Sequence, residues 1–468
     1  MIIERLYDIF LQCGGVVSTD TRTIAPGSLF FALRGERFDA NAFAASALEA
    51  GAAFAVVDNP ALAGVEADVT DDTLAYAVPA PDVAAVPTSQ NDPDTGLRGR
   101  FVVVPDVLEA LQQLARHHRQ TLGVPLLAIT GSNGKTTTKE LVARVLACKF
   151  AVSVTRGNLN NHIGVPLTLL AMTAETQLGI VEMGASARGE IALLCRIAMP
   201  NYGLITNIGR AHLEGFLSPE GVRAGKGELF DCLQSTLGTA FYCECNETVA
   251  GMVRERRELP SVLYPCYELA QPQQGLIAVK YHGETLPTRL VGDYNRYNVS
   301  AAIAIGEYFG VPRGEIAAAI ASYNPDNHRS QRIDTGRNTL IADCYNANPS
   351  SMMAALENFA AEPSPLPRMV ILGDMLELGE YSATEHRRIV DMTLEAGFGR
   401  VFLVGEHFCR VLGAGSVGSV GGASVGPVRC FATLDALREE LRAHPLTGHL
   451  ILLKSSRGIG LENAIAEL

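Results

Sequence analysis

The sequence predicts an α/β protein of three domains, and three observations carry that prediction. The chain has 468 residues, which is too long for one ordinary domain. Short apolar runs of strand length alternate with helical patterns along most of it, as is typical of mostly parallel sheets. One of these runs leads through a glycine loop directly into a helical pattern, which is the arrangement of a phosphate-binding loop.

The N-terminal part has the pattern of a small α/β domain. Apolar runs predict three short strands, at residues 28–33, 53–57 and 101–104. Helical spacing predicts a helix over residues 43–50. Residues 59–97 are rich in Pro, Asp and Ala and have no clear strand or helix pattern, so we interpret them as an insertion. We place this domain at residues 1–106.

The central part has the clearest alternation. An apolar run of buried type at residues 126–130 leads through the glycine loop into a helical pattern over residues 135–149. Two further strands are expected at residues 179–183 and 202–208. Ligands gather at the carboxyl ends of the strands in such sheets, and polar residues follow both of these strands. We place the central domain at residues 107–324.

The last part repeats the alternation and predicts a Rossmann-like, doubly wound domain at residues 325–468. Its strands are expected at residues 339–343, 368–373, 401–405 and 449–453. A helical pattern over residues 382–396 lies between two of them. Residues 413–426 consist largely of Gly, Ser and Val, which predicts a mobile loop.

Composition and charge exclude several functional classes. With 47% hydrophobic and 19% charged residues, the chain has the composition of a soluble globular protein. Its formal net charge of −12 argues against a nucleic-acid binder held by phosphate charge, although backbone N–H groups can still bind a small anion. The sequence shows neither a signal-peptide core nor an apolar run that is long enough to span a bilayer, so we expect no membrane insertion.

Ten cysteines are present, and none forms a Cys-x-x-Cys pair. Cys243 and Cys245 form a Cys-x-Cys pair, with Cys266 further along the chain. Three such thiols are compatible with a zinc site, but buried or free thiols are the interpretation that we favour. We expect the protein in the cytoplasm, where thiols stay reduced.

The glycine loop has the sequence T-G-S-N-G-K-T over residues 130–136. The backbone N–H groups of such a loop and the N-terminus of the following helix face phosphates. Lys135 is expected to bring its ammonium to the β- and γ-phosphate oxygens, and Thr136 to offer its hydroxyl to Mg²⁺. The strict pattern G-x-x-x-x-G-K-[ST] requires glycine where this chain has Ile129, so the loop is a shorter variant.

Three polar residues follow the predicted strands of the central domain. Glu182 lies at a strand end and suits Mg²⁺, which prefers oxygen ligands, with a solvated or capping carboxylate as the alternative. Histidine is a less usual ligand of Mg²⁺, so His212 by itself predicts a hydrogen-bonding or structural role. Lys226 by itself predicts an ordinary exposed lysine.

Motifs along nearly the whole chain resemble those of the Mur ligase family. After the loop variant T-G-S-N-G-K-T-T-T come, in order, matching stretches at residues 158–166, 182–185, 207–215 and 292–298. Residues 343–352, which read D-C-Y-N-A-N-P-S-S-M, are similar to the signature of one member, and residues 372–379 with Glu385 and His386 agree with it. The resemblance implies a UDP-binding N-terminal domain, a central P-loop ATPase-type domain and a C-terminal ligase domain.

An ATP-dependent amide ligase of peptidoglycan synthesis is the activity that the resemblance implies. In this family ATP converts a carboxylate of a UDP-linked muramoyl peptide into an acyl phosphate, and an amine then displaces the phosphate. The signature at residues 343–352 implies UDP-N-acetylmuramoyl-tripeptide and D-alanyl-D-alanine as the two substrates. The family also implies a monomer.

The same resemblance assigns metal and catalytic roles. Two Mg²⁺ ions are implied, with Thr136, Glu182 and His212 as ligands, and this overturns the structural interpretation of the histidine. Lys226 matches a lysine that is carbamylated in several members, and the carbamate would bind the second ion. Such a lysine needs a lowered pKa near cations. The catalytic residues implied are Lys135, Lys226, His212 and Asp343.

Ligand contacts follow from the resemblance as well. Those implied for ATP are Gly131, Ser132, Asn133, Gly134, Lys135, Thr136, Thr137, Asn295, Asn298, Arg329 and Tyr345. Those implied for the substrates are Thr19, Asp20, Thr21, Arg22, Asn160, Asn161, Asn346 and Asn348.

Three alternative functions remain at this stage. One is another amide ligase of the superfamily, either the ligase that adds the third peptide residue or a folylpolyglutamate synthase. Residues 19–22 argue against the folate enzyme, and residues 345–349 argue against the other ligase. The second is a regulator that binds both nucleotides without joining anything, which intact Lys135, Glu182 and His212 disfavour. The third is a plain P-loop kinase.

Overall fold

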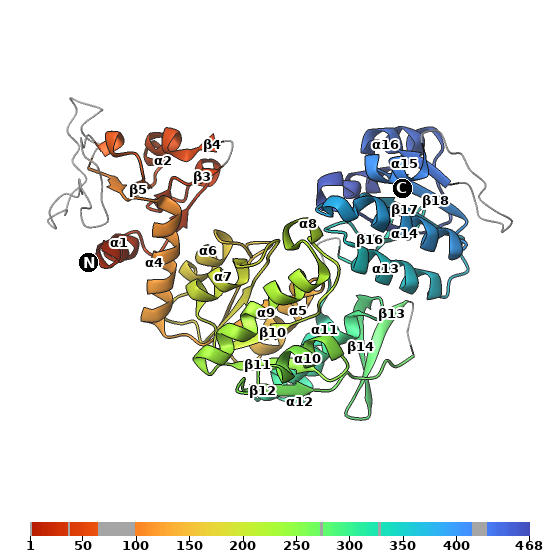
Figure 1. Cartoon of the computed structure of the whole chain (residues 1–468), viewed down its shortest axis with the longest axis horizontal. Helices are drawn as coiled ribbons and strands as arrows, with labels where there is room; N and C mark the ends of the chain where they lie inside the picture. Colours follow the sequence, from red (N-terminus) through yellow and green to blue (C-terminus); the bar gives the residue numbers. More distant parts are fainter. Residues whose placement is uncertain (1, 36–37, 64–98, 272–274, 326–328, 414–427) are drawn as a thin grey trace. The chain divides into compact units, whose positions relative to one another are not determined.

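The computed structural model describes residues 2–35, 38–63, 99–271, 275–325, 329–413 and 428–468 (Figure 1). The predicted insertion from residue 64 onward and the Gly-rich stretch from residue 414 onward lie outside them. The chain forms two compact units, which we describe one at a time. The first comprises Met1–Leu127, Ala151–Met183 and Leu193–Asn201, and the second comprises Ala128–Phe150, Gly184–Ala192 and Tyr202–Leu468.

The first unit begins with a four-stranded parallel sheet of order β1-β2-β5-β6. Its elements are α1 (Ile2–Gln12), β1 (Val17–Ser18), η1 (Thr21–Thr23), β2 (Leu29–Phe31), β3 (Arg34–Gly35), β4 (Phe38–Asp39), η2 (Ala40–Phe43), α2 (Ala44–Glu49), β5 (Phe54–Val57), η3 (Pro60–Ala63) and β6 (Phe101–Val103). Phe30, Leu48 and Val103 belong to its apolar core. The three strands and the helix predicted from the sequence are confirmed, apart from one or two residues at their ends.

Helix α4 (Val107–Leu122) follows, and its ends show why it forms there. The Asp106 carboxylate accepts a hydrogen bond from the backbone N–H of Glu109 at 2.7 Å, which caps the first turn. Gly123 ends the helix in the left-handed conformation, with φ of 63°. The unit also contains β8 (Val152–Val154), α6 (Gly164–Leu170) and β9 (Leu178–Glu182).

Strand β7 (Leu126–Thr130) starts in the first unit and ends in the second. It belongs to a six-stranded sheet of order β12-β11-β10-β7-β9-β8. The second unit contributes α5 (Lys135–Ala147), β10 (Tyr202–Ile205), α8 (Leu213–Phe216), α9 (Pro219–Thr236), β11 (Thr239–Cys243), α10 (Glu247–Arg254) and β12 (Ser261–Tyr264). Helix α7 (Glu190–Ala198) is shared between the units. The strand predicted at 202–208 ends three residues early, because Asn207 binds the glycine loop.

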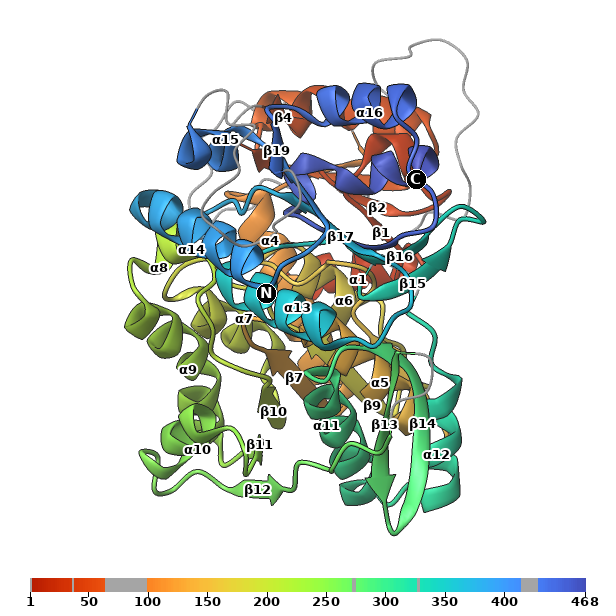
Figure 2. The same cartoon turned by 90° about the vertical axis from the view of Figure 1, so that its right-hand side faces the viewer.

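An antiparallel hairpin of β13 (Leu276–Tyr281) and β14 (Glu284–Val291) follows, which the sequence analysis did not predict (Figure 2). Two helices complete this part of the second unit, α11 (Asn295–Tyr308) and α12 (Arg313–Ser322). Helix α11 packs along α5, the helix that follows the glycine loop. The buried stripe of α11 is rich in Ala and Gly, which lets the two helices approach closely.

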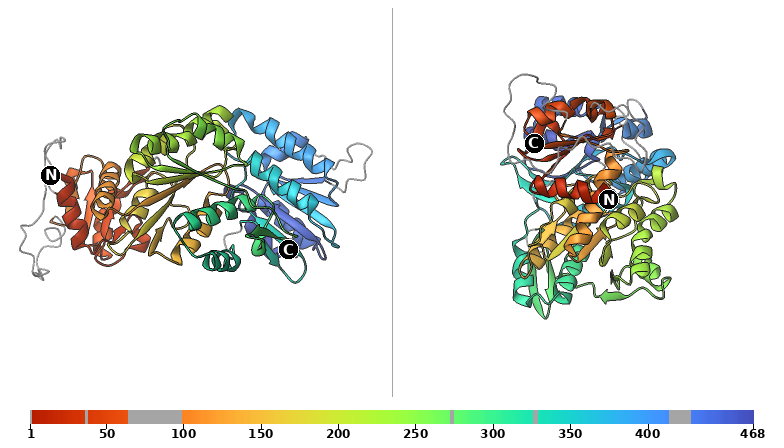
Figure 3. Two further views of the ribbon diagram at one scale, coloured as in Figure 1. Left: turned by 90° about the horizontal axis from the view of Figure 1, so that it is seen from below. Right: turned by 90° about the vertical axis from the view of Figure 1, so that its left-hand side faces the viewer.

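The C-terminal part of the second unit is a doubly wound sheet of order β15-β16-β20-β17-β18-β19, in which only β15 is antiparallel. Its strands are β15 (Gln331–Asp334), β16 (Thr339–Asp343), β17 (Arg368–Gly373), β18 (Arg400–Val404), β19 (Val428–Phe431) and β20 (Leu450–Lys454). The helices are α13 (Pro349–Ala361), η4 (Gly379–Tyr381), α14 (Ser382–Glu395), α15 (Glu406–Leu412), α16 (Leu434–Ala443), η5 (Arg457–Ile459) and η6 (Leu461–Glu467). Figure 3 shows helices on both faces of this sheet.

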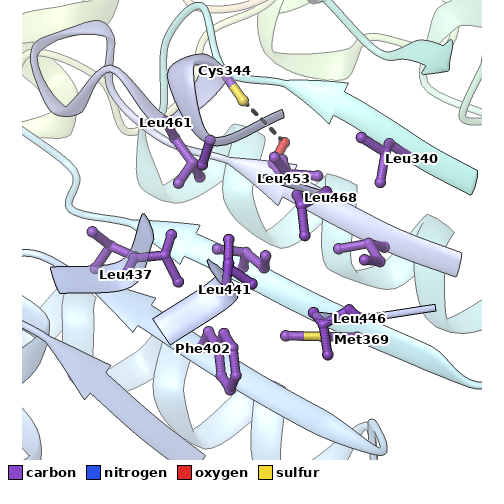
Figure 4. Close-up of a cluster of buried hydrophobic side chains, with 14 of the residues drawn as sticks. Leu340, Cys344, Met369, Phe402, Leu437, Leu441, Leu446, Leu453, Leu461 and Leu468 are labelled. Atoms are coloured by element: carbon purple, nitrogen blue, oxygen red, sulfur yellow. Dashed lines mark hydrogen bonds between the residues drawn. The ribbon is translucent and has the colours of Figure 1, made fainter. Parts of the chain in front are cut away.

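One face of this sheet carries a continuous apolar cluster. Met369 and Phe402 from the strands meet Leu437 and Leu461 from the covering helices (Figure 4). The four parallel strands predicted here from apolar runs are confirmed, and so is the helix at 382–396. The expectation of reduced thiols does not hold for Cys409 and Cys430, whose sulfur atoms form a disulfide of 2.06 Å.

Candidate active site

The glycine loop links β7 to α5, and two of its glycines are required by geometry. Gly131 has φ of 146°, and a Cβ there would lie 1.9 Å from Oγ1 of Thr206. Gly134 has φ of 77°, and a Cβ there would lie 2.6 Å from the side-chain oxygen of Asn298. Ile129, where the strict motif has glycine, is a fully buried residue of β7. The short variant of the loop therefore begins where the strand leaves the core.

The end of the neighbouring strand β10 holds the loop in shape. Ser132 donates its backbone N–H to the Asn207 carbonyl at 2.9 Å, and Asn133 donates its own to the Asn207 side-chain oxygen at 3.0 Å. The Thr206 hydroxyl donates to the Asn133 carbonyl at 2.6 Å. Gly209 donates its N–H to the Ser132 hydroxyl at 2.8 Å. Thr206, Asn207 and Gly209 were not among the predicted site residues, although the last two lie in the motif at residues 207–215.

Lys135 is the first residue of α5, and its ammonium lies over the loop. Its Nζ donates to the carbonyl of Gly131 at 2.9 Å and reaches that of Ser132 at 3.4 Å. Thr136 is buried in the first turn of the helix, and Thr137 is half-buried. Gly134, the N-cap residue, has no side chain to cap that turn. Positive charge and uncapped backbone N–H groups therefore meet at one point, as anion binding requires.

Lys226, on α9, is fully buried, so its interpretation as an ordinary exposed lysine is wrong. Among the described residues, its Nζ has no hydrogen-bond partner. The ammonium lies 5.4 Å from the ring centre of Phe216. Burial, and after it the positive charge of Lys135, lowers the pKa of Lys226 to about 7, while Glu190 acts in the opposite direction. A large part of this amine is neutral at physiological pH.

His212 has a left-handed backbone conformation, with φ of 52°. Its Nδ1 forms a hydrogen bond with the carboxylate of Glu377, in the segment before η4. That hydrogen bond is the main reason that the pKa of Glu377 lies below its usual value. The bond fixes the orientation of the imidazole and leaves Nε2 as the nitrogen available to a ligand.

Glu182 belongs to the first unit, where it ends β9 and is 1% exposed. The Asn160 amide donates to its carboxylate at 2.8 Å. The Glu182 backbone N–H donates to the Thr155 hydroxyl at 3.0 Å. The alternative of a solvated carboxylate is therefore wrong. Asn161, the neighbouring predicted contact, accepts hydrogen bonds from the backbone N–H groups of Ile163 and Gly164 at the start of α6.

Two residues of the signature at residues 343–352, Asp343 and Tyr345, contact cationic side chains. Asp343, at the end of β16, accepts a hydrogen bond of 2.5 Å from Lys454, which is almost completely buried at the end of β20. The guanidinium carbon of Arg329 lies 3.5 Å from the ring centre of Tyr345, and that of Arg457 lies 5.7 Å from it. Lys454 and Arg457 were not predicted as site residues. Cationic groups therefore surround Asp343 and Tyr345.

Asn348, from the same signature, touches the glycine loop. Its side chain caps α13 by accepting from the backbone N–H of Ser351 at 2.9 Å. Its amide donates to the side-chain oxygen of Asn133 at 2.8 Å. Next to it, Arg210 donates its backbone N–H to the Ser350 hydroxyl at 2.8 Å and forms an ion pair of 2.6 Å with buried Glu385. Asn346, in contrast, is exposed and contacts Lys454 only through its carbonyl.

Asn295 and Asn298 lie buried in the first turn of α11. Asn298 donates to the Asn295 side chain at 2.7 Å and accepts from the hydroxyl of Thr138, on α5, at 3.0 Å. Asn295 donates to the Val291 carbonyl at 2.8 Å. The pair joins α11 to the helix of the glycine loop and so helps to fix the position of that helix.

The predicted uridine segment lies at the surface of the first unit. Asp20 accepts hydrogen bonds from the Arg22 guanidinium at 2.9 and 2.6 Å. That pairing, with the backbone hydrogen bond from Arg22, lowers the pKa of Asp20 to about 2. The Arg22 side chain is 86% exposed. Thr19 and Thr21 are half-buried on either side of Asp20.

Comparisons with known proteins agree over nearly the whole chain. Three family models match in order: "Mur ligase family, catalytic domain" over residues 15–119, "Mur ligase middle domain" over residues 129–306, and "Mur ligase, glutamate ligase domain" over residues 328–457. The UDP-N-acetylmuramoyl-tripeptide–D-alanyl-D-alanine ligase of Bacillus subtilis is 33% identical, covering 97% of this chain and 92% of the relative. This chain belongs to the Mur ligase family. The family resemblance and the three-domain α/β fold class predicted from the sequence are thereby confirmed.

Two further comparisons support the assignment to the family. The enzyme of the same name from Escherichia coli is 32% identical, over 97% of this chain and 93% of its own length. The crystal structure of MurF from Acinetobacter baumannii matches with a TM-score of 0.78 and 26% identity, covering 98% of this chain and 97% of the other. Among the described residues, no helix is both long and apolar enough to cross a membrane.

Proposed function

We propose that this Mur ligase joins D-alanyl-D-alanine to UDP-N-acetylmuramoyl-tripeptide, using ATP and releasing ADP and phosphate. The observation that carries the proposal is the match over nearly the whole chain to relatives that bear the name of this ligase. The contact between Asn348 and Asn133 supports it, because it links the D-C-Y-N-A-N-P segment to the phosphate loop. The product is the UDP-linked pentapeptide of peptidoglycan synthesis.

The reaction needs activation because a carboxylate has no good leaving group. The terminal carboxylate of the tripeptide attacks the γ-phosphoryl group of ATP in line, which gives an acyl phosphate and ADP. The amine of D-alanyl-D-alanine then attacks the acyl carbon, phosphate leaves, and the amine loses a proton. Lys135 and the N–H groups around Gly131 neutralise negative charge on the phosphoryl group in transit. The protein acts by positioning and charge stabilisation, so no protein nucleophile is required.

Mg²⁺ is part of this proposal, with Thr136, Glu182, His212 and carbamylated Lys226 as the ligand set. Bound there, the ions would supply Lewis-acid stabilisation of the phosphates. Two observations fit such a set. Glu182 is a buried carboxylate, and the Glu377 contact orients the His212 ring through the nitrogen that a metal does not use.

Carbamylation of Lys226 has its own structural support. The reaction joins a neutral amine to CO₂ with release of one proton, and the lowered pKa makes that amine available. The Nζ has no hydrogen-bond partner among the described residues, which is costly for a buried polar atom. A carbamate would replace an unsatisfied amine with two oxygens able to bind a metal.

We assign the remaining predicted residues to ATP and to the substrates within the same proposal. The loop from Gly131 to Thr137 holds the phosphates, and Asn295, Asn298, Arg329 and Tyr345 form the nucleoside side of the site. The Arg329–Tyr345 stack supports this, because a flat ring and a guanidinium offer stacking and charge to a nucleotide. Thr19, Asp20, Thr21 and Arg22 bind the uridine end, Asn160 and Asn161 the peptide region, and Asn346 and Asn348 the dipeptide.

A coupled assay tests the proposal. Phosphate release is measured with ATP, UDP-N-acetylmuramoyl-tripeptide and D-alanyl-D-alanine together, and then with each omitted. We expect release only with all three, and a pentapeptide product by mass spectrometry. UDP-linked dipeptide with a diamino acid tests the ligase that adds the third residue, and folate with glutamate tests the folate enzyme. Turnover with either of those pairs, and none with the tripeptide and dipeptide, would defeat the proposal.

A further inference from the structure

Three cysteines that the ligase reaction does not use converge at one end of the central sheet. Cys243 is the last residue of β11, and Cys245 lies in the turn before α10. Cys266 comes two residues after the end of β12. β11 and β12 are parallel neighbours, with Cys243 paired beside Tyr264. Because of this pairing, the three sulfur atoms lie within 4.8 Å of one another.

The backbone around the cluster is well ordered by hydrogen bonds. Glu244 donates its N–H to the Tyr264 carbonyl at 3.0 Å, which extends the pairing of the strands past Cys243. Asn246 donates its N–H to the Cys243 carbonyl at 3.2 Å and caps α10 through its side chain. Tyr267 donates its N–H to the Ser300 hydroxyl, on α11, at 3.1 Å. Each cysteine is therefore carried by a backbone segment that is held in place.

The three cysteines differ in exposure, and a cationic side chain interacts with two of them. Cys243 is buried, Cys266 is half-buried and Cys245 is exposed. Arg296 interacts electrostatically with Cys266 and Cys245, which raise its pKa after the larger effect of its hydrogen bond with the Tyr297 hydroxyl. A guanidinium thus lies beside the cluster and balances negative charge there.

Simple packing and a disulfide account for the cluster less well than a metal does. Packing explains a buried thiol such as Cys243, but not the convergence of an exposed thiol upon it. A disulfide would join two of the sulfurs and leave the third without a role. A tetrahedral zinc site has Zn–S bonds of about 2.3 Å, hence sulfur–sulfur separations of roughly 3.8 Å. The three sulfur atoms, all within 4.8 Å of one another, already lie near that separation.

We propose that Cys243, Cys245 and Cys266 form a zinc site that clamps the ends of β11 and β12 beside α11. Binding converts the thiols to three thiolates and releases their protons to solvent. Zn²⁺ with three thiolates carries one negative charge, which the Arg296 guanidinium offsets. A water molecule on the exposed side, next to Cys245, completes the four ligands. The site is independent of the proposed ligase reaction.

Cobalt substitution tests the site directly on the full chain. The protein is stripped with a chelator, kept reduced with a phosphine and titrated with Co²⁺ in excess Mg²⁺. We expect thiolate-to-cobalt charge-transfer absorption and tetrahedral d–d bands that saturate at about one equivalent and disappear when Zn²⁺ is added. Sulfur ligands produce this charge-transfer absorption, so metal bound at oxygen ligands does not mimic it. Absence of the absorption in the folded, reduced wild-type protein would overturn the proposal.

Variants separate this site from other thiols. Cys245→Ser changes an exposed side chain, so the fold is expected to survive, and Zn²⁺ affinity should fall at least ~10-fold. Cys148→Ser is the matched control, because Cys148 is exposed but outside the cluster, and it should bind Zn²⁺ as the wild type does. All variants are made in a Cys409→Ser, Cys430→Ser background, since the reductant opens that disulfide. Unchanged Zn²⁺ affinity in Cys245→Ser would overturn the proposal. So would a Cys243–Cys266 disulfide in the purified protein, if no metal binds once that disulfide has been reduced.

Discussion

The phosphate loop and the N-terminal segment Thr19–Arg22 were both predicted as binding regions, yet the structure builds them differently. The loop is bonded into the protein through Thr206 and Asn207, and its glycines occupy positions where a Cβ would collide. In the N-terminal segment, Asp20 and Arg22 bond to each other at an exposed surface. The loop is therefore preformed, whereas Arg22 is paired with Asp20, and the proposed ligand would have to replace that partner.

This difference has an energetic consequence. A preformed anion site loses little free energy to reorganisation, so each group in it acts with nearly full effect on the transition state. An exposed ion pair is screened by water, so replacing one of its partners by a ligand gains little free energy. We therefore expect substitutions in and around the loop to reduce turnover strongly, and substitutions in the N-terminal segment to change mainly the KM of one substrate.

Replacing the loop lysine should have the largest effect. Lys135→Ala removes the ammonium that lies 2.9 Å from the Gly131 carbonyl, over the loop. We expect kcat/KM to fall by at least ~10³-fold, with an unchanged circular dichroism spectrum. ADP and phosphate release measure it. Lys280→Ala, at an exposed lysine of the hairpin, is the control and should keep full activity. An active Lys135→Ala enzyme would refute the loop assignment.

Lys226 tests whether a buried amine beside the loop is catalytic. Lys226→Met should lower kcat by about 10²–10³-fold, because the proposed carbamate ligand is lost. A small carboxylate such as formate should restore part of the activity by replacing the carbamate oxygens. Lys226→Met should also retain or gain stability, since an unsatisfied amine leaves the core. Full activity without added carboxylate would exclude the carbamate.

The pH dependence of carbamylation follows from the pKa of Lys226, which burial lowers to about 7. The neutral amine reacts with CO₂ and one proton is released, so the carbamate fraction at constant dissolved CO₂ should rise with pH until the site is saturated. The rise should be steeper below pH 7 than above it, because below pH 7 the amine must also lose its own proton. Carbon-13 NMR with labelled bicarbonate measures the carbamate. The signal should be absent in Lys226→Met. A rise that keeps its full steepness up to pH 8, with no change near pH 7, would contradict the assigned pKa shift.

Asn348 probes the link between the signature and the loop. Asn348→Ala removes both the helix cap and the bond to Asn133, so stability should drop by about 1 kcal/mol and kcat/KM by roughly 10-fold. Asn348→Ser keeps a capping hydroxyl and removes only the contact with the loop. It should lose the same activity with little loss of stability, as measured by denaturant unfolding. Wild-type activity in Asn348→Ser would show that Asn348 matters only as a cap.

The smallest effect is expected in the N-terminal segment. Arg22→Ala should raise the KM for the UDP-linked peptide by about 3- to 10-fold, with kcat and the KM for ATP unchanged. Asp20→Asn keeps the backbone bond to the Arg22 N–H and serves as the matched variant that only removes charge. Steady-state kinetics with each substrate varied in turn distinguish these outcomes. A large fall in kcat in Arg22→Ala would mean that the contrast with the loop does not hold.

Local patterns in the sequence were sufficient to predict most of the fold. The buried strands were recognised because short, largely apolar runs such as residues 126–130 and 368–373, alternating with helical patterns, are typical of strands covered on both faces. The hairpin β13–β14 was missed, because its alternating, partly exposed residues have a weaker pattern. The glycine loop was found because a strand, two glycines and a Lys-Thr pair form a local signal.

What the sequence determined by itself was therefore the α/β class, the order of strands and helices, the phosphate loop and, through ordered motifs, the Mur ligase family. The tertiary structure alone decided that Lys226 is a buried amine with a pKa near 7, that Glu377 orients His212, that Asn348 reaches the loop and that three distant cysteines meet. Burial and pairing depend on residues far apart in the chain, and no local pattern of side chains encodes which of them will be neighbours.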